Sequence, residues 1–128
     1  MKEPMEKSRS LASAPLTVRV DDITALLAEQ KAMDVVCLDI SQKSGGSFAD
    51  RLFILTATSP RHARAIAEAI SKLCHEKNYE FLRIEGQEVG EWVLVDLNDI
   101  VVCIFLEATR ALYRLEDMWG HFSKESHA

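Results

Sequence analysis

The sequence predicts one α/β domain, in which helices pack against a mixed five-stranded β-sheet in the order αββαβββα. Two observations lead to this fold class. Short apolar, β-branched runs are interspersed with segments of helical periodicity without strict alternation, which favours a mixed sheet over a purely parallel one. The length of 128 residues fits a single domain with one hydrophobic core.

Capping residues and apolar periodicity place the elements along the chain. Ser59 and Pro60 suit the start of the clearest helix, whose apolar residues recur at i, i+3, i+4 and i+7. Gly45 and Gly46 can take positive φ between two apolar strands, which predicts a hairpin. The expected elements are a helix from Asp21 or Asp22 to near Lys31, strands at 34–40 and 50–57, a helix from Pro60 to Lys77, strands at 81–84, 92–96 and 100–105, and a helix at 107–119.

Both ends of the chain are expected to lie outside the domain, which would span residues 20–120. Residues 1–19 mix Ser, Lys, Glu and Pro with little periodicity and predict a flexible N-terminal arm. Residues 121–128 are largely polar and predict a flexible C-terminal tail. Gly120 suits the position that follows the end of the last helix.

Composition and charge narrow the classes of function. The formal net charge is −5, so the chain lacks the positive field that grips phosphate backbones. A basic protein surface is therefore the favoured partner, and sequence-specific nucleic acid binding is not expected. No apolar run reaches the roughly 18 residues of a membrane helix and no secretory signal is recognisable, so we expect a cytoplasmic location.

Three cysteines, Cys37, Cys74 and Cys103, lie in apolar runs without a C-x-x-C pair. Buried free thiols in a reducing compartment are the expected state. The four histidines show no spacing with these cysteines that suits zinc. We therefore expect neither a metal nor another cofactor.

Alternation over Trp92–Leu97 predicts a strand with two different faces. Its odd-numbered residues form a core face, whereas Trp92, Leu94 and Asp96 share the other face. Two interpretations are open at this point. Either Trp92 lies under a helix and Asp96 caps a turn, or Trp92 anchors a partner, since tryptophan is enriched in binding hot spots. Tyr113 lies off the apolar stripe of the last helix and fits the second interpretation.

An enzymatic alternative comes from three aspartates around a glycine-rich turn. A Gly-Gly-Ser turn precedes Asp50, and Asp34 and Asp39 flank a strand. Nucleotidyltransferases hold phosphate at such a turn and Mg²⁺ between paired carboxylates. Here the turn leads into a strand and the second carboxylate of the usual pair is missing, so catalysis is not expected.

Four segments resemble the ribosomal silencing factor family, called RsfS or Iojap. They are T-x-T-S-x-R-H at 56–62, Glu85-Gly86, W-V-L-V-D-L-x-D at 92–99 and R-x-L-Y-x-L-E-x-M-W at 110–119. Their order and spacing resemble the family over about residues 22–120, which is nearly the whole predicted domain.

The resemblance implies a fold related to nucleotidyltransferases but without catalysis. It also implies binding to ribosomal protein L-fourteen on the large ribosomal subunit. The bound factor would sterically block joining with the small subunit and repress translation under nutrient limitation. Members of the family often form homodimers when they are free.

A lysine- and arginine-rich ribosomal protein would attract an acidic domain. On this interpretation, the partner-binding residues are two aromatic anchors and four acidic side chains: Trp92, Tyr113, Glu85, Asp96, Asp99 and Glu107. A homodimeric adaptor for another partner is the remaining alternative, beside the metal-dependent enzyme.

Overall fold

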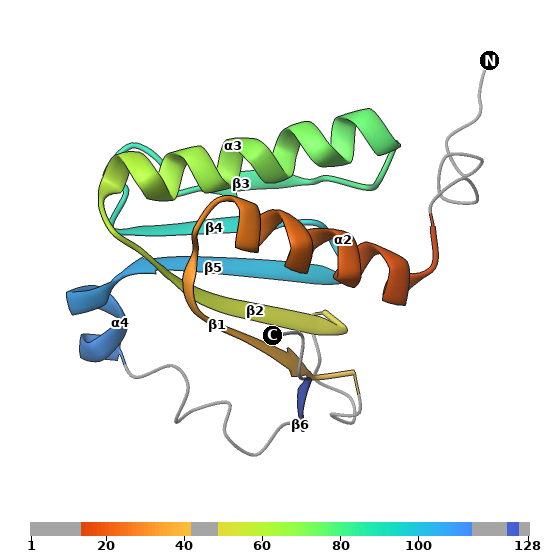
Figure 1. Cartoon of the computed structure of the whole chain (residues 1–128), viewed down its shortest axis with the longest axis horizontal. Coiled ribbons are helices and arrows are strands. Elements are labelled where there is room, and N and C mark those ends of the chain that lie inside the picture. Colours follow the sequence, from red (N-terminus) through yellow and green to blue (C-terminus); the bar gives the residue numbers. More distant parts are fainter. Residues whose placement is uncertain (1–13, 42–48, 114–122, 126–128) are drawn as a thin grey trace.

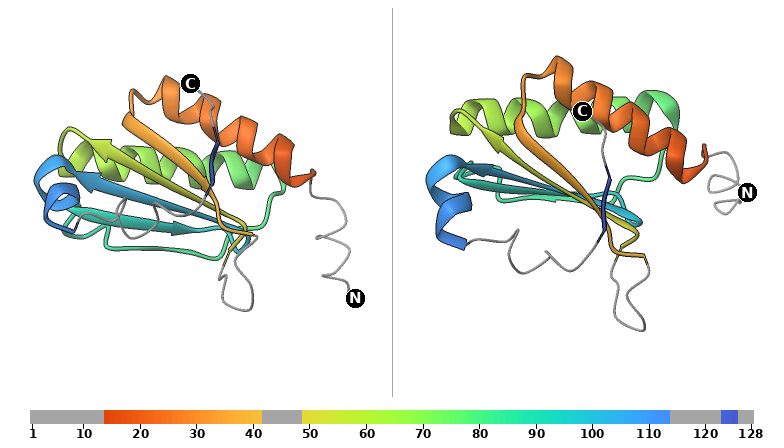
Figure 2. Two further views of the ribbon diagram at one scale, coloured as in Figure 1. Left: turned by 90° about the horizontal axis from the view of Figure 1, so that it is seen from below. Right: turned by 60° about the horizontal axis from the view of Figure 1, so that its bottom comes forward.

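The computed structural model describes residues 14–41, 49–113 and 123–125. Its elements in chain order are α2 (Leu16–Glu29), β1 (Met33–Asp39), β2 (Arg51–Ala57), α3 (Pro60–Lys77), β3 (Arg83–Glu85), β4 (Trp92–Asp96), β5 (Ile100–Leu106), α4 (Glu107–Tyr113) and β6 (Ser123–Glu125). Helices α2 and α3 lie on the same face of a twisted sheet, and α4 follows β5 at one end of it (Figures 1 and 2). The predicted α/β class is confirmed.

The sheet has the strand order β3-β4-β5-β2-β1-β6. Strands β2 and β5 run parallel, whereas the other neighbours are antiparallel. The predicted mixed sheet and the predicted hairpins β1–β2 and β4–β5 are therefore confirmed. A parallel pair needs a long crossover connection, which the chain makes here through α3, β3 and β4.

A short strand in the C-terminal region was not expected. The sequence predicted a flexible tail over 121–128, but β6 pairs antiparallel with β1, so that prediction is wrong for residues 123–125. The physical reason is that β1 would otherwise be an edge strand with unpaired backbone groups, and β6 covers that edge. Three polar residues, Ser-Lys-Glu, carry no alternation from which a strand could be predicted.

Helix α2 begins at Leu16, five residues before Asp21. The predicted arm over 1–19 is therefore wrong for its last four residues. Pro15 occupies the cap position with φ −56°, and its carbonyl accepts a hydrogen bond from the Arg19 N–H at 3.1 Å, so proline starts the helix where an aspartate cap was expected. The apolar stripe of α2 already includes this first turn: Leu16, Val20, Ile23 and Leu27.

Helix α3 is confirmed with its predicted start. The Ser59 hydroxyl accepts a hydrogen bond from the His62 N–H at 3.0 Å, and Pro60 is the first helical residue. Asn78 ends the helix in the left-handed conformation with φ 60°. Strand β3 starts at Arg83, two residues later than predicted. The predicted last helix is confirmed over Glu107–Tyr113, and residues 114–119 lie outside the described residues.

Apolar side chains fill both faces of the sheet. The larger cluster packs the strands against α2 and α3 and includes Val93, Val95 and Leu97, as their alternation predicted. The second cluster lies on the opposite face and is built from these residues: Leu38, Ile40, Ala49, Leu52, Ile54, Val101, Cys103 and Phe105. Strand β5 contributes to both clusters, so it is buried on both faces.

Asp99, in the turn of the β4–β5 hairpin, joins three parts of the fold. Its carboxylate accepts two hydrogen bonds from the Arg19 guanidinium of α2, at 2.8 and 2.9 Å. Its carbonyl accepts the backbone N–H groups of Asp50 and Arg51, at 2.8 and 3.1 Å. Because bidentate arginine–carboxylate pairs are geometrically specific, this contact fixes the turn against both α2 and the start of β2.

We predict that Asp99→Asn lowers the free energy of unfolding by about 2 kcal/mol, because the mostly buried Arg19 loses its charged partner. Urea unfolding followed by circular dichroism measures the loss. The double variant Arg19→Met/Asp99→Asn should recover part of it, since the uncompensated cation is gone. A loss below about 0.5 kcal/mol, the range of ordinary surface substitutions, would contradict this role of Asp99.

Candidate partner-binding surface

The predicted partner-binding residues lie at two different ends of the sheet. Trp92 is the first residue of β4, Asp96 is its last residue and Asp99 lies in the turn beyond. Four residue steps along a strand span about 13 Å. Glu107 is the first residue of α4, directly after β5, and Trp92 pairs with Phe105 of β5. The structure therefore brings Trp92 and Glu107 together and places Asp99 away from them.

Asp96 and Glu85 share an arginine. The Asp96 carboxylate accepts the backbone N–H of Asn98 at 2.9 Å and forms an ion pair with Arg83 at 3.2 Å. The Glu85 carboxylate accepts a hydrogen bond from the same guanidinium at 2.7 Å. Asp96 thus caps the hairpin turn, as one of the two interpretations had it, and is only 15% exposed. Glu85 is 59% exposed, so it is the more accessible carboxylate of the two.

Trp92 combines an exposed surface with a fixed orientation. It is 44% exposed, and its ring stacks on Phe105 with 5.7 Å between centroids and 11° between planes. Phe105 itself is fully buried. A hydrogen bond also joins the Trp92 and Cys103 side chains. The ring therefore stacks on a residue of the second core cluster while 44% of the residue stays exposed, and its role as an anchor for a partner stays a prediction.

Two acidic residues lie close to Trp92 along the backbone. Glu91 and Glu107 are both exposed, and the Glu91 carbonyl accepts the Leu106 N–H at 3.1 Å, which joins the start of β4 to the start of α4. We call the residues Val89, Glu91, Trp92 and Glu107 the Trp92 end of the sheet. Sequence reasoning missed Glu91, although it stands beside Trp92 in the chain. The side chain of Tyr113 lies outside the described residues.

Arg110 holds α4 against the sheet. Although it is a charged residue, it is only 8% exposed. Its guanidinium donates hydrogen bonds to the Asp34 carbonyl at 2.8 Å and to the Thr56 hydroxyl at 2.9 Å. Buried charges are stable only when they are hydrogen-bonded. The contact therefore orients α4, and Glu107 with it.

The three aspartates of the enzymatic alternative do not assemble into a metal site. Asp39 accepts hydrogen bonds from Ser41 and Arg51, and those from Ser41 are the main cause that lowers its pKa. The Gly-Gly-Ser turn lies outside the described residues. Among the described residues, no three His, Cys, Asp or Glu side chains are grouped so that they could hold a metal ion. None of the helices described has both the length and the apolarity needed to cross a membrane.

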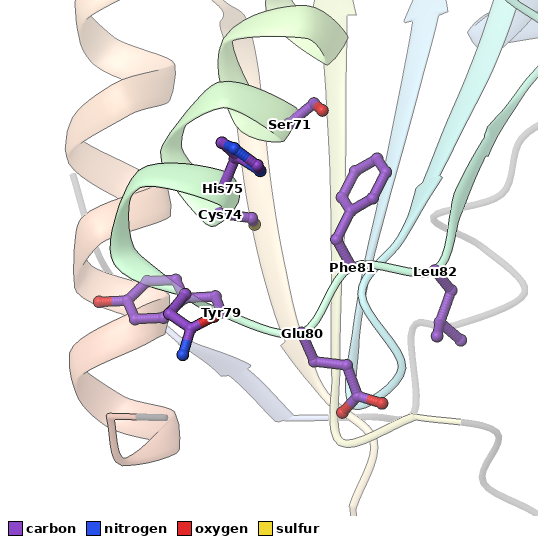
Figure 3. Close-up of a pocket in the computed structure, with 8 residues that line it drawn as sticks. Ser71, Cys74, His75, Tyr79, Glu80, Phe81 and Leu82 are labelled. Atoms are coloured by element: carbon purple, nitrogen blue, oxygen red, sulfur yellow. The ribbon is translucent and has the colours of Figure 1, made fainter. Parts of the chain in front are cut away.

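A hollow of about 370 Å³ lies at the other end of the sheet, between α3 and the segment that leads into β3 (Figure 3). Ser71 and His75 line it from α3, and Phe81 and Leu82 line it from that segment. Glu80, also in its wall, accepts a hydrogen bond from the Asn98 side chain at 3.2 Å. The hollow therefore lies beside the hairpin turn and contains none of the predicted partner-binding residues.

We predict that Trp92→Ala makes the Cys103 thiol reactive. Burial raises the pKa of this thiol to about 12, so the native protein should react slowly with Ellman's reagent at pH 8. Removing the indole admits water and relieves the desolvation that raises the thiol pKa, and this larger effect should outweigh the loss of the indole hydrogen bond, which lowers that pKa. The reaction should accelerate roughly tenfold or more, because the thiolate is the nucleophile.

Trp92→Phe is the matched control, since it keeps an aromatic ring over Phe105. Cys37 and Cys74 lie in the helix-side cluster and should stay slow in both variants. Equal rates for Trp92→Ala and the parent protein would show that the indole does not shield Cys103.

Comparisons with known proteins agree with this structure. The family model "Ribosomal silencing factor during starvation" matches residues 13–128. The ribosomal silencing factor RsfS of Halalkalibacterium halodurans is 39% identical over 92 residues, which cover 72% of this chain and 77% of that protein. The one from Chromobacterium violaceum is 36% identical over 94 residues, covering 73% and 75%.

A solved structure supports the same assignment. The crystal structure of a Chromobacterium violaceum protein superposes with a TM-score of 0.78 at 31% identity, and the match covers 90% of this chain and 93% of that one. The family match spans nearly all of the chain, as the resemblance of the four sequence segments had implied. The chain belongs to the ribosomal silencing factor (RsfS) family.

Proposed function

We propose that this chain binds ribosomal protein L-fourteen on the large ribosomal subunit and sterically blocks joining with the small subunit. Translation would thereby be repressed under nutrient limitation. Membership in the silencing factor family supports the regulatory role. The observation that carries the choice of surface is Trp92, which is exposed on one side and fixed on the other by Phe105.

A preoriented aromatic side chain is a favourable anchor. Binding normally costs about 0.5–1.5 kcal/mol for each flexible side chain that becomes immobilised. Stacking on Phe105 and the hydrogen bond with Cys103 have already restricted the Trp92 ring in the free protein. More of the contact energy is then available for affinity, which fits the enrichment of tryptophan in hot spots.

Charge supports a basic partner. The chain has a formal net charge of −5, and Glu91 and Glu107 are exposed beside Trp92. Glu85 adds an accessible carboxylate near the middle of β4, where it pairs with Leu94. Asp96 and Asp99 form internal ion pairs and are only 15% and 31% exposed, so we assign them to the architecture of the hairpin. Glu85 also pairs with Arg83 but is 59% exposed, so we give the partner contact to Trp92, Glu107 and Glu85.

The proposed mechanism needs no catalysis. A domain docked at the subunit interface excludes the small subunit by its volume, so affinity and position suffice. We also propose that the protein acts in the cytoplasm and forms a homodimer when it is free of the ribosome. Neither Trp92 nor the nearby carboxylates have a catalytic role in this mechanism.

The test is sedimentation of purified large and small subunits with added protein. We expect the parent protein to sediment with large subunits and to reduce the fraction of joined ribosomes. Trp92→Ala should weaken association about tenfold or more, as for a hot-spot aromatic. The variant should stay folded, because losing the stacked pair costs only about 0.5–1.5 kcal/mol beyond the lost area.

Val18→Ala is the matched control, since Val18 is 43% exposed and lies on α2 rather than at the Trp92 end. It should bind like the parent protein. If the parent protein neither sedimented with large subunits nor reduced joining, the proposed function would be wrong. If Val18→Ala weakened binding as much as Trp92→Ala, the choice of surface would be wrong.

We also predict that salt weakens the association, mainly through the rate of binding. Exposed charges are screened over a Debye length of about 10 Å at 0.1 M salt, and the length shortens as salt increases. Surface plasmon resonance with purified ribosomal protein L-fourteen should show a falling association rate between 0.1 and 0.5 M KCl. Glu107→Gln should flatten this dependence, and a rate independent of salt would contradict electrostatic steering.

A further inference from the structure

The loop between β3 and β4, residues 86–91, presents an apolar side chain to solvent. Val89 is 66% exposed, more than any other large apolar residue that the structure describes. A single exposed apolar side chain is ordinary when its loop is free to move. This loop is unusual because its backbone is closely confined at both ends.

Two glycines confine the loop. Gly86 and Gly90 have φ of +84° and +82°, and the Gly90 N–H donates to the Gly86 carbonyl at 3.0 Å. A Cβ on Gly86 would lie 2.1 Å from the Trp92 carbonyl oxygen, and one on Gly90 would lie 2.6 Å from the Pro60 Cβ. The loop therefore packs its backbone directly against the first residues of β4 and α3, at positions that only glycine fits.

The same contacts set where Val89 lies. It precedes Trp92 by three residues, so the two Cα atoms are at most about 11 Å apart. The Arg64 side chain donates to the Gln87 carbonyl at 3.3 Å, which ties the loop to α3. Figure 1 shows the loop, the start of α3 and α4 at the same end of the sheet. Val89 and Trp92 thus fall well within a single interface, which usually covers about 800 Å² per partner.

We propose that Val89 is a second apolar anchor, which acts with Trp92 on an apolar patch bordered by lysine or arginine on a basic protein. This inference rests on the proposed function and adds a residue to its surface. A basic occupant is favoured because Glu88 and Glu91, one and two residues from Val89, are both exposed, whereas the nearby Arg64 guanidinium is bonded to the Gln87 carbonyl. A confined loop presents the side chain without a large ordering cost on binding.

The test compares Val89→Ser with Leu82→Ser in the binding assay with purified large subunits at constant salt. Leu82 is the control because it is also exposed, at 47%, but lines the hollow at the other end of the sheet. We expect Val89→Ser to raise the Kd about five- to twentyfold. Val89→Ile, which keeps an apolar side chain at this position, should bind with the Kd of the parent protein. Leu82→Ser should stay within about twofold of the parent protein, and thermal midpoints should be equal, since exposed sites tolerate substitution.

The outcomes separate this inference from the proposed function. Unchanged affinity for Val89→Ser, with Trp92→Ala still weakened, would overturn the second anchor and leave the proposed function standing. An equal loss for Leu82→Ser would also overturn it, because the effect would not be local to the Trp92 end. If the parent protein did not bind large subunits at all, both would be overturned.

Discussion

Burial of β5 on both faces is the constraint on which the rest of the structure depends. All of its residues from Ile100 to Phe105 are buried, and each large apolar side chain buried in this way contributes about 1.5–3 kcal/mol. A strand of this kind needs a cover on each face and a neighbour on each edge. Helices α2 and α3 cover one face, and β2 and β4 provide the two edges. On the other face, Trp92 covers Phe105.

This arrangement gives Trp92 two roles that cannot be separated completely. The side of the indole that stacks on Phe105 stabilises the second cluster, and the outward side is available to a partner. A change at Trp92 therefore alters both stability and binding, whereas a change at Val89 or Glu107 should alter binding alone. Comparing the three positions distinguishes a contact with the partner from a general loss of structure at this end of the sheet.

The sequence could predict what depends on neighbours in the chain. Period-two alternation identified the two faces of β4, and Ser59 with Pro60 identified the start of α3. It could not tell that the Asp99 carboxylate meets Arg19, because the two residues are 80 positions apart. Sequence distance also hides the partners of Arg110 in α4, because Asp34 lies in β1 and Thr56 in β2. Asp96 and Asp99, which the sequence predicted as partner-binding carboxylates, thus form ion pairs with arginines that only the fold brings near them.

The size of the Trp92 end also indicates how far the proposed interface must extend. Nanomolar affinity corresponds to about 12 kcal/mol, and interfaces of ordinary size cover about 800 Å² on each partner. A large aromatic side chain buries at most about 250 Å², and Trp92 has less than half of its surface exposed. Trp92 alone therefore cannot provide the contact area, even with the most favourable orientation. The loop at 86–91 on one side and α4 on the other are the adjoining elements that can complete it, because the backbone hydrogen bond between Glu91 and Leu106 holds them together beside the ring.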